Sequence, residues 1–171
     1  MSQGFNLHQH KKFRENGTIG ALLDEYERAI SELRDVIDSV DDHHLHVTVD
    51  HETEDKNCVS IQSILTHVVQ SGHTYVVEIR KWMGEPAQYR DKILLNTSAE
   101  YERALKEMFS ANEKLFEDYP NIMLTIKDSS KKMTTRWGQQ YDVDQLMAHA
   151  IVHVLKHRRQ IERFIKKLND L

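Results

Sequence analysis

Hydrophobic residues recur at steps of three and four along four long stretches of the chain, which is the spacing of one buried helical face. The first stretch predicts a helix over residues 18–39, and the second predicts a helix over residues 58–83. Gly84 and Pro86 follow the second stretch, and both residue types favour the end of a helix. The first half of the chain therefore contributes two amphipathic helices.

Two further helices are predicted in the second half of the chain. One covers residues 98–119, with Ser98 as its N-cap and Pro120 directly after its end. The other begins near Asp142 and continues almost to the C-terminus. Between them, residues 121–141 contain two short β-prone stretches, NIMLTIKDSS and MTTRWGQQY, which favour a small hairpin formed by pairing of the two stretches.

The connection between the first two predicted helices, DDHHLHVTVDHETEDKN, is acidic, rich in histidine and without a helical period. It is expected to be a long exposed loop. The 171 residues include only six glycines and two prolines, which are too few for the many turns of a β-sandwich or barrel. The pattern therefore predicts an all-α protein, a four-helix bundle formed by one domain over residues 1–171.

Composition limits the classes of partner and compartment. The formal net charge is −4, and no basic stripe marks a nucleic-acid-binding surface, so nucleic acid is not expected as a partner. No window approaches the roughly 20 apolar residues that span a bilayer, and the N-terminal sequence lacks the apolar stretch of a signal peptide. Cys58 is the single cysteine, which excludes an intramolecular disulfide. We expect a soluble cytoplasmic protein, and apolar surface on two helices could support a homodimer.

Eleven histidines are the unusual feature of the composition. The segment HAIVHVLKH in the last predicted helix places His149, His153 and His157 at successive steps of four. Neighbours at this spacing lie about 5–6 Å apart on one face, so one adjacent pair can bind an ion, whereas the first and third cannot share one. His67 lies among apolar residues of the second predicted helix and could add a third nitrogen ligand. Three such ligands leave a position open, as in catalytic metal sites.

Two motifs extend this interpretation. SIQSILTH (60–67), followed near the C-terminus by HVLKHRRQI (153–161), resembles the pattern of the DinB/YfiT-like four-helix proteins, and the order and lengths of the helices agree. The metal ligands that the resemblance implies are His67, His153 and His157. Arg159 stands where the family usually has glycine after H-R, which affects packing beside the site and removes no ligand.

The resemblance implies a metal-dependent enzyme, because family members with assigned activities include transferases that use low-molecular-weight thiols. A divalent metal, zinc or nickel, would hold a thiol as the nucleophilic thiolate for attack on a small-molecule substrate. In a hydrolytic alternative, water takes the open position. A non-catalytic, stress-related or interaction protein, in which the ion is structural or absent, is the alternative from another class.

Several other residues have a structural explanation beside a functional one. His149 is expected to pack beside the site, and residues 137–139 either line its entrance or cap the bundle. His73 lies about 240° around the helix from His67 and is expected to be exposed. Glu78 returns to the face of His67 but lies too far along the helix to be a ligand.

Three remaining features are expected to be structural or solvated. Cys58 is expected to be an ordinary thiol, because about 13 Å of helix separates it from His67. The histidines of the acidic connection could bind a metal weakly, but they are expected to be solvated: His43, His44, His46 and His51. The basic run of the last helix could bind an anion, but it is expected to complement the helix dipole: Lys156, Arg158, Arg159, Arg163, Lys166 and Lys167.

Overall fold

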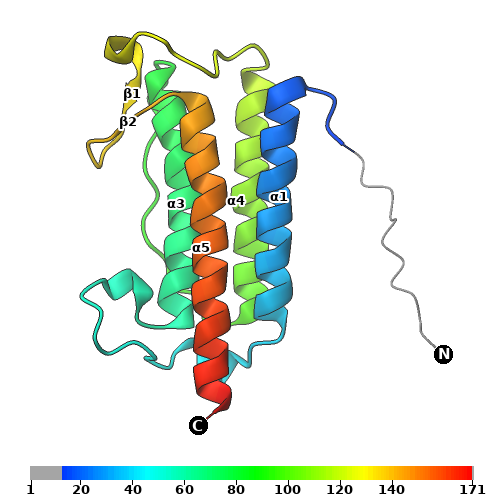
Figure 1. Cartoon of the computed structure of the whole chain (residues 1–171), viewed down its shortest axis with the longest axis vertical. Helices are drawn as coiled ribbons and strands as arrows, with labels where there is room; N and C mark the ends of the chain where they lie inside the picture. The colour runs from blue at the N-terminus through cyan, green and yellow to red at the C-terminus, as the bar shows by residue number, and fades with distance from the viewer. Residues whose placement is uncertain (1–12, 171) are drawn as a thin grey trace, which may run out of the picture.

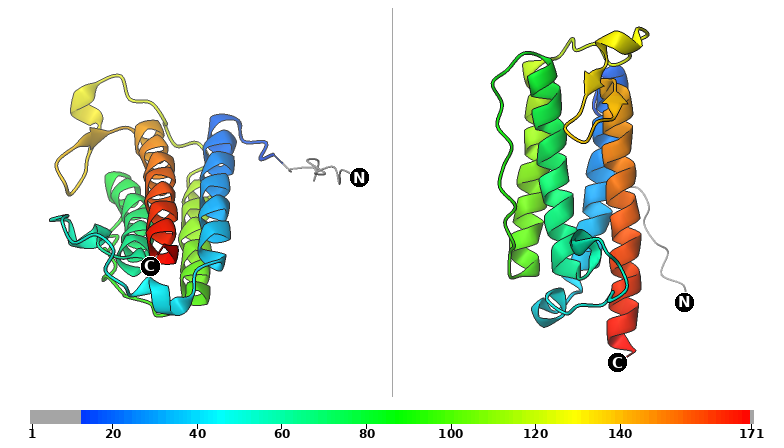
Figure 2. Two further views of the ribbon diagram at one scale, coloured as in Figure 1. Left: turned by 60° about the horizontal axis from the view of Figure 1, so that its bottom comes forward. Right: turned by 90° about the vertical axis from the view of Figure 1, so that its left-hand side faces the viewer.

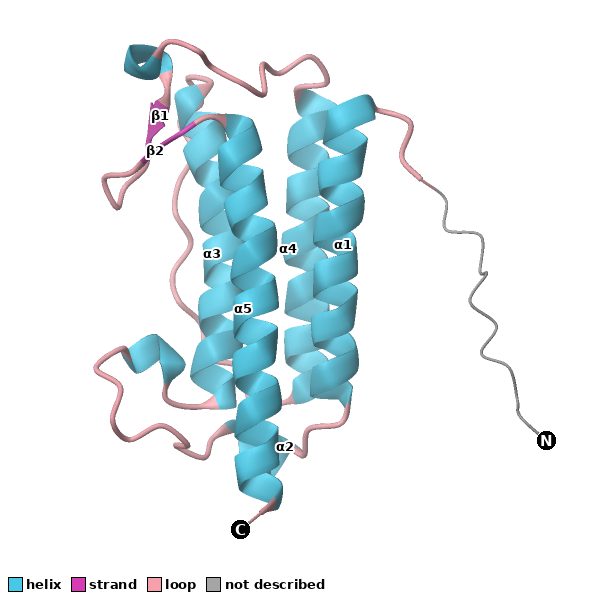
Figure 3. Cartoon of the chain, viewed as in Figure 1, coloured by secondary structure: helices cyan, strands magenta, loops and turns pink. Residues whose placement is uncertain are grey.

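The computed structural model describes residues 13–170, and four long helices make up most of it (Figures 1 and 3). They are α1 (Gly17–Asp38), α3 (Ile61–Trp82), α4 (Ser98–Asp118) and α5 (Val143–Asn169). α1 packs against α4 and α5, and α3 packs against the same two helices, so the four close into a bundle. The predicted all-α class and the four predicted helices are confirmed, with boundaries that differ by at most three residues.

Capping side chains fix where the helices begin. Ser60 opens α3 and Asp142 opens α5, each with a capping box in which the N-cap and the third helical residue bond to each other's backbone N–H. The N-cap of α4 is Thr97, whose side chain accepts from the backbone N–H of Glu100, so the prediction of Ser98 was wrong. Thr97 has the extended backbone that an N-cap needs, whereas Ser98 is already helical.

The connection between α1 and α3 is more ordered than the predicted exposed loop. It contains one turn of helix, α2 (Asp42–Leu45), and a 3₁₀ turn, η1 (Lys56–Cys58). Leu45 is fully buried in the hydrophobic core, and the backbone N–H of Val49 donates to the carbonyl of Val59. Burial of one apolar side chain and local backbone pairing therefore hold this segment against the end of the bundle.

The direction of the helices requires a second long connection, which the sequence pattern did not predict. α3 and α4 run in the same direction along the bundle, so residues 83–97 return along its outside from one end to the other (Figure 2). The backbone carbonyl of Leu95 in this crossover accepts from the side chain of Gln62 in α3. The crossover covers part of the outer face of α3, where it also contacts His73 through Arg90.

A small hairpin lies at the end of the bundle where α3 ends and α5 begins (Figures 1 and 2). Its strands are β1 (Met133–Thr134) and β2 (Gln140–Tyr141), which pair antiparallel with Met133 opposite Tyr141. Both strands belong to the second β-prone stretch, so the predicted pairing between the two stretches was wrong. The first stretch is tied down by the bundle instead, because Ile122 is buried in its core and Ile126 donates a backbone hydrogen bond to Asp142.

One continuous hydrophobic core runs through the bundle and includes fully buried side chains from all four long helices: Leu33, Ile64, Leu65, Leu105, Met108, Leu146 and Met147. Gly72 lets α3 approach α4 closely, because a Cβ atom there would lie 2.1 Å from the sulfur of Met108. No helix among the described residues is long and apolar enough to cross a membrane.

Candidate metal centre

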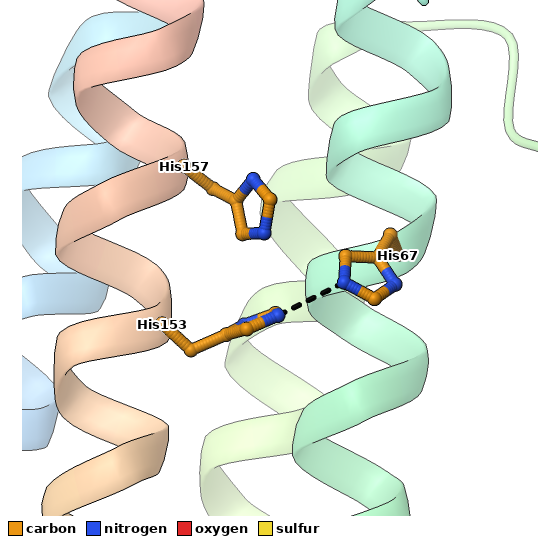
Figure 4. A group of neighbouring side chains, drawn as sticks. All are labelled: His67, His153 and His157. Carbon is orange, nitrogen blue, oxygen red and sulfur yellow. Dashed lines mark hydrogen bonds between the residues drawn. The ribbon is translucent and has the colours of Figure 1, made fainter. Parts of the chain in front are cut away.

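Three histidines from two helices meet in the seam between α3 and α5 (Figure 4). His67 projects from the first half of α3, and His153 and His157 project from successive turns of α5. One ring nitrogen of each residue lies within 4.8 Å of the corresponding nitrogens of the other two. The structure therefore brings together the three residues that the family resemblance selected, in a group that could hold a metal ion.

His67 and His153 make a direct nitrogen–nitrogen contact within the group. Their Nε2 atoms are 2.9 Å apart, as the dashed line in Figure 4 marks. Two unprotonated imidazole nitrogens at this separation would point lone pairs at each other, so the contact requires either a proton or a cation between them. A shared cation satisfies both nitrogens at once, and without one a hydrogen bond in which one Nε2–H donates to the other ring does the same.

Burial keeps the three imidazoles neutral. It lowers the pKa of His153 to about 2, with additional repulsion from His157 and His67. His157 is 1% exposed, and its burial lowers its pKa to about 4. Burial also lowers the pKa of His67. Neutral imidazole is the form that binds a metal, so the seam holds these side chains ready for coordination near neutral pH.

Gln160 determines which nitrogen of His157 faces the group. Its Oε1 atom lies 3.1 Å from Nδ1 of His157. An amide oxygen only accepts hydrogen bonds, so Nδ1 carries the proton and Nε2 presents its lone pair. Gln160 was not predicted as a site residue, although its position three residues after His157 places the two side chains on one helix face.

A cavity of about 480 Å³ opens beside the group. His67 and His153 form part of its wall, and the other lining residues come from α3, the hairpin and the first turns of α5: Gln70, Ser71, Thr74, Tyr75, Arg136, Trp137, Gln139 and His149. A small molecule in this cavity would lie directly against two of the three histidines. The geometry is that of a recessed binding site with an accessible nitrogen cluster.

The hairpin supplies the outer wall of the cavity. Trp137 is 39% exposed, packs edge-on against Tyr75 with 6.1 Å between ring centroids, and donates its indole N–H to Gln139. Of the two explanations for this segment, lining the site is the one that the structure supports. Gly138 has φ of +86°, a conformation that favours glycine, and it completes the tight turn between the strands.

His149 lies beside the group and is not a member of it. Its ring stacks on that of His153 with 6.1 Å between centroids, and its Nδ1 atom is 3.5 Å from the hydroxyl of Tyr141. It also lines the cavity. The expectation that His149 packs beside the site is confirmed.

His73 corrects one sequence expectation. It was expected to be exposed but is 8% exposed, and its Nε2 atom accepts a hydrogen bond from Arg90, 3.2 Å away. Burial, aided by the neighbouring guanidinium, lowers the pKa of His73 to about 4. The helical period placed it correctly away from His67, but the crossover that covers this face could not be read from the period.

Glu78 is outside the histidine group, as expected, but it has a role that sequence analysis missed. It is 4% exposed, and its Oε1 atom accepts hydrogen bonds from the hydroxyl of Tyr89 and the backbone N–H of Arg136. A carboxylate on α3 thus joins the crossover to the hairpin. No feature of the local sequence around Glu78 identifies these partners.

Cys58 and the loop histidines remain outside the site. Cys58 lies in η1, before α3 begins, and burial together with the nearby Asp55 carboxylate raises the pKa of its thiol. This environment suppresses thiolate formation, which agrees with an ordinary thiol. Within residues 13–170, the histidine group in the seam is the one cluster of metal-binding side chains, and the loop histidines form none.

Comparison with known proteins supports the same classification. No curated protein sequence matches the chain. The sequence model of the DinB family matches residues 9–168, which is nearly the full length and includes both histidine motifs. On this basis, the chain belongs to the DinB family.

Proposed function

We propose that the chain is a metal-dependent transferase that binds zinc or nickel through His67, His153 and His157 and acts with a low-molecular-weight thiol. The observation that carries the proposal is the convergence of three neutral imidazole nitrogens, with two of the three rings in the wall of a cavity. Neutral imidazole suits both metals. Three protein ligands on one side leave the cavity side available to a small molecule.

When bound, a divalent ion would keep a coordinated thiol in its thiolate form, which is the nucleophile. The reaction class is displacement: the sulfur forms a bond to an electrophilic carbon, and the leaving group departs with the electrons of the broken bond. The thiol proton passes to solvent.

The chain's own residues hold and orient the reactants. Gln160 keeps the Nε2 lone pair of His157 directed at the group. Tyr75 and Trp137 offer apolar surface to the body of a small molecule, and the side chains of Ser71 and Thr74 offer hydrogen bonds. The hairpin contributes Arg136, Trp137 and Gln139 to the wall of this cavity.

The lining of the cavity favours a thiol over water as the attacking group. None of the described residues that line the cavity is an aspartate or glutamate. A hydrolytic metal site commonly uses a carboxylate as the general base that takes a proton from water. A coordinated thiol is deprotonated by the metal itself and needs no such base. His149 also lines the cavity and could take a proton from water, but burial lowers its pKa and weakens it as a base, so the lining favours the transferase over the hydrolase.

Cobalt substitution tests the proposal, because bound thiolate gives Co²⁺ a strong charge-transfer absorption in the near ultraviolet. We expect small thiols to produce this absorption in the Co²⁺-loaded protein, and His67→Ala to abolish it. His149→Ala is the matched control, since it removes a neighbouring imidazole from outside the group and should retain the absorption. A Co²⁺ spectrum that no thiol changes would overturn the thiol-dependent function.

A further inference from the structure

Among the described residues, the cavity beside the histidines is lined by a positive charge and by no negative charge. Arg136 is the one formally charged side chain among its described lining residues, and no carboxylate lines it. The histidines in its wall, His67, His149 and His153, supply no negative charge either. Any bound divalent cation would make the cavity more positive still.

Two neighbouring residues hold Arg136 in place. The guanidinium carbon lies 4.4 Å from the centre of the Tyr89 ring, which is a cation–π contact. The hydroxyl of Tyr89 donates to Oε1 of Glu78 over 2.9 Å, and the backbone N–H of Arg136 donates to the same atom over 3.0 Å. A single buried carboxylate therefore positions both the backbone of Arg136 and the ring on which its side chain rests.

The guanidinium itself is left without an anionic partner. Arg136 forms no ion pair with any residue of the described part of the chain. Its planar set of N–H donors matches a carboxylate or another small oxyanion. Glu78 forms no ion pair with the guanidinium, and its Oε1 atom bonds to the backbone of Arg136 and to Tyr89 instead.

We propose that the cavity selects substrates that carry a carboxylate or a similar small oxyanion, and that Arg136 binds this group. The remainder of the substrate then extends along Tyr75 and Trp137 toward His67 and His153. This inference rests on the proposed function, because it assigns a substrate class to the same site. Glu78 and Tyr89 act as positioning residues for Arg136.

Matched thiols test the charge preference in the full-length Co²⁺-loaded protein. Mercaptopropionate is compared with mercaptoethanol, and mercaptohexanoate with mercaptohexanol, so that each pair differs in its terminal group at one of two chain lengths. Dissociation constants come from the cobalt–thiolate absorption. Because thiols differ in intrinsic acidity, the quantity to compare is the ratio of dissociation constants between variant and wild type for each thiol.

Arg136→Gln removes the charge while retaining polar atoms. We expect it to weaken binding of at least one carboxylate thiol about tenfold and to leave the alcohol thiols unchanged, as for the loss of one charge-assisted hydrogen bond. Arg136→Lys should restore part of the preference. Arg103→Gln, which removes an exposed arginine on α4 away from the cavity, should have no effect. Equal ratios for carboxylate and alcohol thiols in Arg136→Gln would overturn the inference.

A second experiment tests the anion site independently of the thiol chemistry. Hexanoate and hexanol are titrated into the metal-free protein while the indole N–H resonance of Trp137 is followed by NMR. We expect hexanoate to shift this resonance at lower concentration than hexanol in wild type, and the difference to disappear in Arg136→Gln. If thiols fail to bind Co²⁺ but this difference is present, the proposed reaction is wrong and the anion site stands. If wild type shows no difference, the anion site is wrong.

Discussion

At the scale of single residues, orientation of His157 depends on one hydrogen bond. Gln160 accepts from Nδ1, and this fixes Nε2 as the nitrogen that faces His67 and His153. Partners of this kind set the tautomer and ring orientation of a metal ligand. Gln160 therefore belongs to the site although it is not one of the three converging side chains.

Replacement of Gln160 tests this role. Gln160→Leu removes the acceptor and should weaken metal binding by about 10- to 100-fold, whereas Gln160→Glu keeps an acceptor and should bind at least as tightly as wild type. Affinity is measured by competition with a chromophoric chelator. If the leucine and glutamate variants bind equally well, the hydrogen bond does not position His157.

His73 makes a second prediction at this scale, on the pH dependence of stability. Its pKa is about 4 in the folded protein and near 6.5 when unfolded, so the unfolded state binds more protons between these values. The free energy of unfolding should therefore fall as pH falls from 6.5 toward 4. The contribution of His73 to this fall in the free energy of unfolding is on the order of 3 kcal/mol.

His73→Gln retains an acceptor for Arg90 but cannot titrate, so it should flatten the fall in stability over this pH range. Urea unfolding of the metal-free protein at a series of pH values measures the effect. An unchanged slope in the variant would show that His73 is not held neutral by burial.

At the scale of the elements, periodicity predicted the four long helices because a helical face is a local property of the sequence. The pairing of the hairpin was mispredicted because two-residue strands carry little local preference, and burial of Ile122 in the core competes with pairing. Burial of His73 was missed for a similar reason, since the covering crossover has no period of its own.

The residues of the candidate site were likewise predicted only in part. Residue spacing placed His153 and His157 on one face, and the family resemblance selected that pair and joined it to His67. Glu78 was missed because its partners depend on which elements meet in space, whereas Gln160 lies on the same helix face as His157 but its spacing alone does not show the hydrogen bond. In particular, the bond from Glu78 to the backbone of Arg136 joins residues 58 positions apart.

Gly72 supplies a prediction about the packing of α3 against α4. In Gly72→Ala the new Cβ atom would meet the fully buried Met108, whose sulfur and Cγ lie 2.1 and 2.6 Å away. We expect a loss of about 1–3 kcal/mol in the free energy of unfolding, despite the better helix propensity of alanine. Denaturant unfolding measures it, and stabilisation by this substitution would contradict the close approach of the two helices.

At the scale of the whole molecule, the histidine group occupies one seam of a bundle whose core extends well beyond it. The fully buried apolar side chains come from all four helices, and α1 packs against α4 on the side away from that seam. Arg14, which lies just before α1, also forms an ion pair with Glu113 of α4. The bundle therefore has stabilising contacts that are independent of a bound ion.

Metal removal tests this independence. We expect a strong chelator to leave the helical circular dichroism signal unchanged at room temperature and to lower the melting temperature, because bound metal stabilises the folded state by mass action. Loss of the helical signal on chelation would instead identify the ion as a structural element, as in small zinc domains.

The central claim is that His67, His153 and His157 together hold one metal ion. Elemental analysis of the purified protein tests it most directly, with His67→Ala, His153→Ala and His157→Ala beside His149→Ala as the matched histidine control. We predict stoichiometric metal in wild type and His149→Ala, and little or none in the other three variants. Full metal content in His67→Ala would contradict a site shared between α3 and α5.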